Sequence, residues 1–198
     1  MTDLQQWVAP TFEGLAELLA AAPTEAWQAQ SLCEKWQVRH VVAHVTMPAR
    51  FTPEQYGAEL AAAGGDFTVL SDTVAARDGA LPHDELLAQL RSPQLHAWQP
   101  PGGGAAGALS HAAIHSLDIT IALDRPPTVP DPAATALLEL LTDSNGEWFG
   151  IDLTGVRVLA GDTDWSWGSG EPVTADRGEL IALLSGRTLP DGRALRRR

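Results

Sequence analysis

Hydrophobic residues recur at helical spacing through the first two thirds of the chain, and prolines and glycines separate the segments. Apolar side chains at every third or fourth position are typical of helices that bury one face. Helices are therefore predicted at residues 11–22, 38–45, 53–63 and 105–123, and in a segment that begins at Pro82. Four substantial helices with connections of moderate length indicate an antiparallel four-helix bundle.

The pattern changes after Pro130, where short elements of both kinds follow one another. Asp131 and Pro132 favour a helix start as N-cap and first helical residue, and Gly186 favours a helix end. The predicted elements are a helix at 131–141, a strand at 156–160, its hairpin partner at 164–167 and a helix at 178–185.

The predicted fold class is therefore α+β, in two domains. We place the boundary near Thr128, between a helical bundle at residues 1–128 and a small α+β domain at residues 129–198. The arginine-rich tail, residues 196–198, is expected to be frayed.

The amino-acid composition argues against several classes of function. The chain has 198 residues and a formal net charge of −12, which argues against binding to nucleic acid or to an anionic membrane. A single cysteine, Cys33, excludes an internal disulfide and a metal cage of several thiolates. Because no 18-residue apolar stretch and no secretory signal pattern occur, we expect a soluble, cytoplasmic protein, as monomer or homodimer.

Histidines are the side chains that point most directly to chemistry. His111 and His115 are four residues apart on one predicted helix, so both imidazoles project from the same face. With His44 from a second helix they can hold one metal ion such as zinc, which requires their ring nitrogens within about 4 Å of one another. Three ligands leave a fourth position open, as in catalytic sites. Asp118 shares the face of His115 and is expected to orient it.

Each of these residues also has a simpler interpretation. A histidine pair at this spacing is equally compatible with hydrogen-bonded core residues, and His40 competes with His44 because it lies on the same helix face. Cys33 is interpreted as a packed, inert thiol. Further candidates for cofactor or substrate contacts are Arg50, Arg77, Trp165 and Trp167, whose alternatives are surface arginines and cover for the small sheet.

Three segments together resemble one known family. The segment Ser-Leu-Cys-Glu-Lys-Trp-Gln-Val-Arg-His-Val-Val-Ala-His, from Ser31 to His44, resembles the signature of the mycothiol-dependent maleylpyruvate isomerase-like family of the DinB-like superfamily. The segment from His111 to Asp118 resembles the family's ligand pair on the last bundle helix. Residues 163–168 and 180–187 resemble its small C-terminal domain, which is related to sterol-carrier-like α+β modules.

The resemblance implies a four-helix bundle that binds a divalent metal, usually zinc, through His44, His111 and His115. It implies mycothiol or a similar low-molecular-weight thiol as cofactor, and a small electrophile as substrate of a transferase or isomerase. Two positions depart from the family pattern, since His111 stands where the isomerase has glutamate and His40 where aspartate is common. A metal-dependent hydrolase and a non-catalytic metal- or ligand-binding stress protein remain alternatives.

Overall fold

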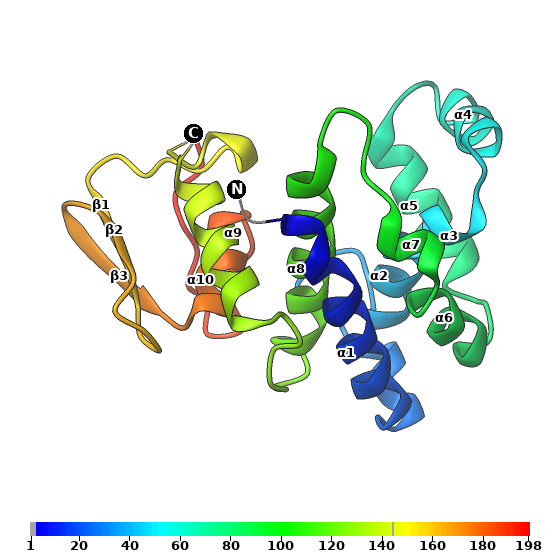
Figure 1. Cartoon of the computed structure of the whole chain (residues 1–198), viewed down its shortest axis with the longest axis horizontal. Coiled ribbons are helices and arrows are strands. Elements are labelled where there is room, and N and C mark those ends of the chain that lie inside the picture. The colour runs from blue at the N-terminus through cyan, green and yellow to red at the C-terminus, as the bar shows by residue number, and fades with distance from the viewer. Residues whose placement is uncertain (1–2, 144) are drawn as a thin grey trace.

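The computed structural model describes residues 3–143 and 145–198, which form a helical part followed by a smaller α+β part (Figure 1). The helices of the first part are η1 (Leu4–Trp7), α1 (Val8–Ala20), η2 (Thr24–Gln28), α2 (Val38–Val45), α3 (Met47–Arg50), α4 (Pro53–Ala62), α5 (Phe67–Asp78), α6 (His83–Leu90), α7 (Pro93–Ala97) and α8 (Gly104–Thr120). The second part contains α9 (Asp131–Asp143), η3 (Glu147–Phe149), β1 (Val156–Ala160), β2 (Ser166–Gly168), β3 (Glu171–Ala175) and α10 (Arg177–Leu184).

The helices with a clear apolar face were predicted well. Helix α2 spans the predicted residues, while α1 begins three residues earlier than expected and α8 ends three residues earlier. Pro82 is the N-cap of α6 and not its first helical residue. These shifts affect helix ends, where capping and not the apolar face decides the boundary.

Helix α5 is the main element that the hydrophobic pattern did not predict. Its first turn exposes Phe67 and Val69, whereas polar Ser71 and Asp78 are buried, so its apolar residues define no single face. Asp66 caps it, with Oδ1 accepting from the backbone N–H groups of Thr68 and Val69. Helix α5 packs against α2, while α4, one of the predicted helices, has no buried residue. The helical part is therefore more elaborate than the expected set of helices.

The small sheet has the strand order β2-β1-β3. Strand β1 coincides with the predicted strand, and β2 is its antiparallel neighbour, with Val158 opposite Trp167. Strand β3, which was not predicted, runs parallel to β1. Gly170, with φ of +127°, precedes β3 at a point where a Cβ would lie 2.0 Å from the Gly155 carbonyl oxygen, so only glycine fits this crossing.

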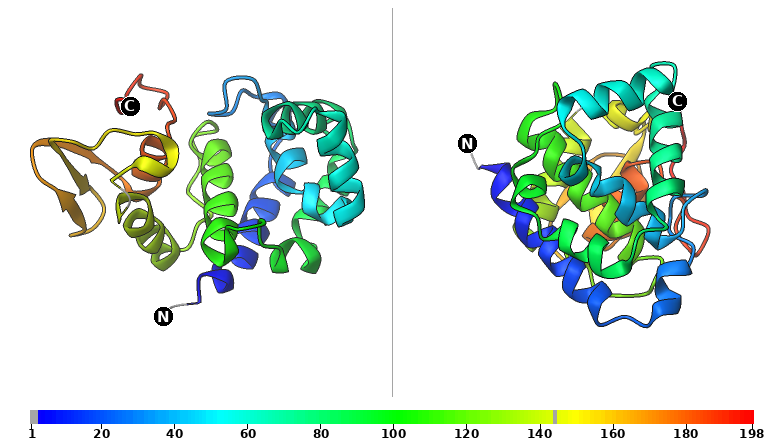
Figure 2. Two further views of the ribbon diagram at one scale, coloured as in Figure 1. Left: turned by 90° about the horizontal axis from the view of Figure 1, so that it is seen from above. Right: turned by 90° about the vertical axis from the view of Figure 1, so that its right-hand side faces the viewer.

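Helix α8 lies between the two parts of the molecule (Figures 1 and 2). One side of α8, including Leu109 and Leu117, packs into a core with α9, α10 and β1. The opposite side, including Ala112 and Ile119, packs with α1, α2 and α6. Because both cores share this helix, the side chains of α8 are held in place from both directions.

The C-terminal residues are paired, in contrast to the expected frayed tail. Arg197 forms an isolated antiparallel bridge with Ile151, and the Arg198 backbone N–H donates to the Gly150 carbonyl. The Arg196 guanidinium forms an ion pair with Asp152. Charge repulsion within the arginine run is thus offset by acceptors on the segment after α9. None of the helices in the described residues has the length and hydropathy needed to cross a membrane.

Candidate metal centre

Three histidines converge where α2 packs against α8. His44 projects from α2, and His111 and His115 project from successive turns of α8. One ring nitrogen of each lies within 4.8 Å of the others, and the ring centroids are 4.9 to 5.3 Å apart. The bound of 4.8 Å lies close to the expected separation of about 4 Å, and the three side chains are near enough to hold one metal ion. The arrangement brings together the residues that the sequence proposed as ligands.

The surroundings keep the imidazoles of His44 and His111 uncharged. Burial, followed by the neighbouring His115 and His111, holds the pKa of His44 well below its ordinary value. Burial and then His115 lower the pKa of His111 to about 3. Neutral imidazoles offer a free lone pair at neutral pH, which is the state that a metal ligand requires.

A buried carboxylate orients His115. Asp118 is fully buried, and its Oδ2 lies 2.9 Å from His115 Nδ1. Burial alone would raise the pKa of Asp118, but hydrogen bonds from His115 and Arg187 outweigh it and hold the pKa well below its ordinary value. The ionised carboxylate therefore accepts the Nδ1 proton of His115, which leaves Nε2 free for a ligand bond.

Arg187 completes this contact and was not singled out from the sequence. Its Nε donates to Asp118 Oδ1 at 2.8 Å and its Nη2 to Oδ2 at 2.9 Å, a bidentate pair. Arg187 follows α10 and Gly186, whose φ of +80° turns the chain back toward α8. The available signal was the Gly-Arg pair after a helix, but only the tertiary fold shows which carboxylate it meets.

Cys33 lies at the same carboxylate. Its Sγ donates to Asp118 Oδ2 at 3.1 Å, and burial together with the Asp118 charge raises the pKa of the thiol to about 12. A thiol that stays protonated is a poor nucleophile. Cys33, His115 and Asp118 also lie close enough to hold an ion, but Arg187 occupies both Asp118 oxygens. We therefore interpret this group as a hydrogen-bond cluster.

A cleft of about 1170 Å³ opens beside the histidines. His44 and His115 line it, together with the Trp36 ring, which lies 4.8 Å from the His44 ring. The remaining walls come from the segment before α2, the start of α5 and the segment after α10, and include Ser31, Lys35, Phe67, Ser71, Asp72, Arg187, Thr188, Leu195 and Arg197. The cleft therefore has aromatic side chains beside the histidines and charged side chains at its rim.

The other candidate residues lie elsewhere. Trp165 and Trp167 pack on the C-terminal core and do not line the cleft, whose wall on that side is the segment after α10. Arg50 and Arg77 are paired with Asp78, at 2.9 and 2.6 Å, and are not part of the lining. Their guanidinium groups are engaged in ion pairs that hold helices together.

His40 is placed apart from the other histidines. Its Nδ1 accepts from the Gln37 backbone N–H at 3.1 Å, as part of the capping box at the start of α2. The residue that competed with His44 therefore has a local structural role.

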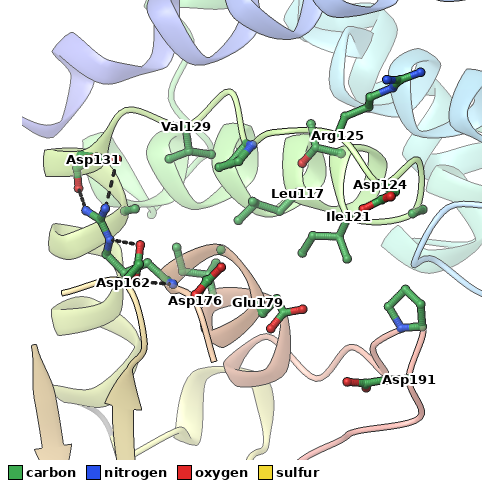
Figure 3. Close-up of a pocket in the computed structure, with 18 residues that line it drawn as sticks. Leu117, Ile121, Asp124, Arg125, Val129, Asp131, Asp162, Asp176, Glu179 and Asp191 are labelled. Atoms are coloured by element: carbon green, nitrogen blue, oxygen red, sulfur yellow. Dashed lines mark hydrogen bonds and ion pairs between the residues drawn. The ribbon is translucent and has the colours of Figure 1, made fainter. Parts of the chain in front are cut away.

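A second cavity, of about 650 Å³, lies between α8, α9 and α10 (Figure 3). None of the residues proposed from the sequence lines it. Its most prominent cation, Arg177, is paired with Asp131 at 3.1 Å and with Asp162 at 2.8 Å. These pairs tie the start of α9 to the start of α10.

The chain is similar to known proteins in part of its sequence and in its fold. Residues 8–98 match the family model described as the mycothiol maleylpyruvate isomerase N-terminal domain. Residues 8–98, a little less than half of the chain, are therefore similar to this N-terminal domain. The match includes His44 and ends before α8, which carries the other two histidines.

Two solved structures are similar over nearly the whole chain. One is a histidine-to-alanine mutant of the mycothiol-dependent maleylpyruvate isomerase, with 15% identity and a TM-score of 0.56. The other is the mycothiol-dependent maleylpyruvate isomerase itself, with 15% identity and a TM-score of 0.51. Each comparison covers 98% of this chain and 95% of the other, so the C-terminal part shares the fold as well. No curated protein matches the sequence.

Proposed function

We propose that His44, His111 and His115 bind a divalent metal ion, with zinc as the first candidate, and that the chain is a thiol-dependent isomerase or transferase. The observation that carries this proposal is the convergence of three histidine side chains beside a cleft. The family of the N-terminal domain supports mycothiol, or a similar low-molecular-weight thiol, as the cofactor.

The donor set fits such an ion. Zinc binds imidazole nitrogen readily, and catalytic zinc sites in proteins commonly combine three protein ligands with one open position. His115 has its second nitrogen occupied by Asp118, as metal-bound histidines nearly always do. A divalent ion held by His44, His111 and His115 would lower the pKa of a bound thiol and so supply a thiolate, a nucleophile suited to conjugated double bonds and other electrophiles.

The side chains of the cleft have separate tasks. Asp118 fixes the tautomer and ring orientation of His115, and Arg187 fixes Asp118. Trp36 and Phe67, whose ring centroids lie 4.8 and 6.3 Å from that of His44, form an apolar wall on that side. The charged side chains at the rim, among them the Lys35–Asp72 pair, would select among small electrophiles.

The residue type at position 111 affects which substrate we expect. The resemblance places glutamate at this position in the isomerase, and a neutral imidazole there leaves the centre more cationic by one charge. Such a centre stabilises an anionic ligand more strongly, so we propose the general class of small electrophiles as substrate and not maleylpyruvate in particular.

Binding of a thiol and of its S-methyl derivative to zinc-loaded protein tests the proposal. Only the free thiol can ionise, so mycothiol should bind far more tightly than S-methyl mycothiol and should release a proton. Isothermal calorimetry in two buffers of different ionisation enthalpy counts that proton. Equal binding without proton release would favour the hydrolase, and a protein that binds no zinc would favour the non-catalytic binding protein.

A further inference from the structure

Two buried polar atoms lack a hydrogen-bond partner among the described residues near the centre: His44 Nδ1 and Ser71 Oγ. The His44 side chain is 3% exposed and Ser71 is 5% exposed. Buried polar groups are nearly always paired, so each of these atoms calls for an explanation.

Both atoms belong to the interface between α2 and α5. Phe67 packs on His44, with ring centroids 6.3 Å apart, and a Cβ added to Gly79 would lie 2.5 Å from His40 Cδ2. Residues 67, 71 and 75 follow one face of α5 toward Gly79 at its C-cap, just as His40 and His44 share one face of α2. Ser71 therefore lies between these two contacts, one helical turn from Phe67, which packs on His44. It also lines the cleft with His44.

The Ser71 hydroxyl lacks a bond that several other hydroxyls in or next to helices make to a backbone carbonyl. Thr46, Thr73 and Ser110 each donate to the backbone carbonyl four residues earlier, at 2.7 to 2.8 Å. Ser71 makes no such bond, so its oxygen is available to accept from a neighbouring helix.

We propose that Ser71 is a positioning residue for His44. Its hydroxyl oxygen accepts the Nδ1 proton of His44, directly after rotation about χ1 or through one buried water, and so directs Nε2 toward His111 and His115. Ser71 thereby does for His44 what Asp118 does for His115. The inference rests on the proposed metal centre, because the bond fixes the tautomer that a metal ligand needs.

Zinc affinity measured by calorimetry tests this role. Ser71→Ala should weaken zinc binding on the order of 10-fold, the lower end of the effect of losing such a partner. Ser71→Thr keeps the hydroxyl and should retain more of the affinity than Ser71→Ala. Ser116→Ala is the matched control, because Ser116 is also a buried hydroxyl without a partner among the described residues but does not line the cleft. Its zinc affinity should equal that of the unaltered chain.

The His44 ring itself gives a second measurement. In zinc-loaded protein with ¹⁵N-labelled histidine, the Nδ1 proton of His44 should exchange slowly with water, and Ser71→Ala should accelerate the exchange. Unchanged zinc affinity and exchange in Ser71→Ala, or an equal loss in Ser116→Ala, would overturn the inference while leaving the centre intact. If the unaltered chain binds no zinc, or binds it equally well with His111→Ala, the metal centre itself is wrong.

Discussion

Burial of the His44 and His111 imidazoles makes the stability of the metal-free protein depend on pH. Burial lowers the pKa of both, so the folded protein without metal resists taking up these protons. In the unfolded chain these histidines have the ordinary pKa of about 6.5 and take up protons below that pH. Protons therefore accumulate on the unfolded state as the pH falls, and the free energy of unfolding decreases with them.

We expect the metal-free protein to lose about 2 kcal/mol of stability per buried histidine between pH 7 and pH 5, from linkage with an unfolded pKa of about 6.5. Urea unfolding in the presence of a chelator measures the loss at both pH values. His111→Asn removes one of the two groups and should reduce the pH dependence by about half. Equal stability at pH 7 and pH 5 would contradict the burial of uncharged imidazoles.

The sequence predicted which side chains lie close together where both residues belong to one helix. His111 and His115 share a face of α8 by spacing alone, so their proximity needed no tertiary information. Arg187 could not be found in this way, because it is 69 residues from the carboxylate that it binds. The contacts of Arg50 and Arg77 also required tertiary information. Their ion-pair partner Asp78 is buried only because α5 packs against its neighbours.

Among the elements, α5 depends most on its cap. Asp66 satisfies two backbone N–H groups in the first turn, directly before residues that line the cleft. Asp66→Ala should lower the global free energy of unfolding by about 1 kcal/mol, the typical value of an N-cap. Chemical denaturation followed by circular dichroism measures the change.

Thr52 at the start of α4 provides the comparison. It caps α4 in the same manner, with Oγ1 accepting from the Gln55 backbone N–H at 3.2 Å. Because α4 has no buried residue, Thr52→Ala should loosen that helix locally with little change in global stability. Similar global losses for both variants would argue that α4 is part of the cooperative core.

The two helices also show what decides predictability. Helix α2 buries Val38, Val41, Val42 and Val45, so its apolar face appears in the sequence. Helix α5 buries a serine and an aspartate and exposes a phenylalanine, because it lines a cleft on one side and binds arginines on another. Functional and ionic contacts thus replace the apolar pattern from which helices are predicted.

In the whole molecule, the Asp118–Arg187 pair joins the C-terminal part to the helix that carries two of the histidines. Asp118 is fully buried and Arg187 has only 20% of its side chain exposed. Removing one partner leaves the other charge without compensation in a region with little water. The pair therefore links the docking of α10 to the geometry at His115.

We expect Arg187→Met to lower the free energy of unfolding by about 3–5 kcal/mol, the range for breaking a buried ion pair. Adding Asp118→Asn should recover part of the loss, since no buried charge then remains. Arg193→Met is the control, because Arg193 is 42% exposed and its ion pairs should contribute less than about 1 kcal/mol. Urea unfolding of the three variants distinguishes these cases, and equal losses for Arg187→Met and Arg193→Met would contradict the assigned role.

Helix α8 packs against a core on each side, and this limits which substitutions it can accept. Its residues from Ala108 to Thr120 are buried on nearly every side and include two histidines of the centre. Few substitutions there leave both cores and the histidine geometry undisturbed, whereas the outer helix α4 has no fully buried residue. In related chains, sequence drift should therefore concentrate in α4, and α8 should retain small residues between its histidines.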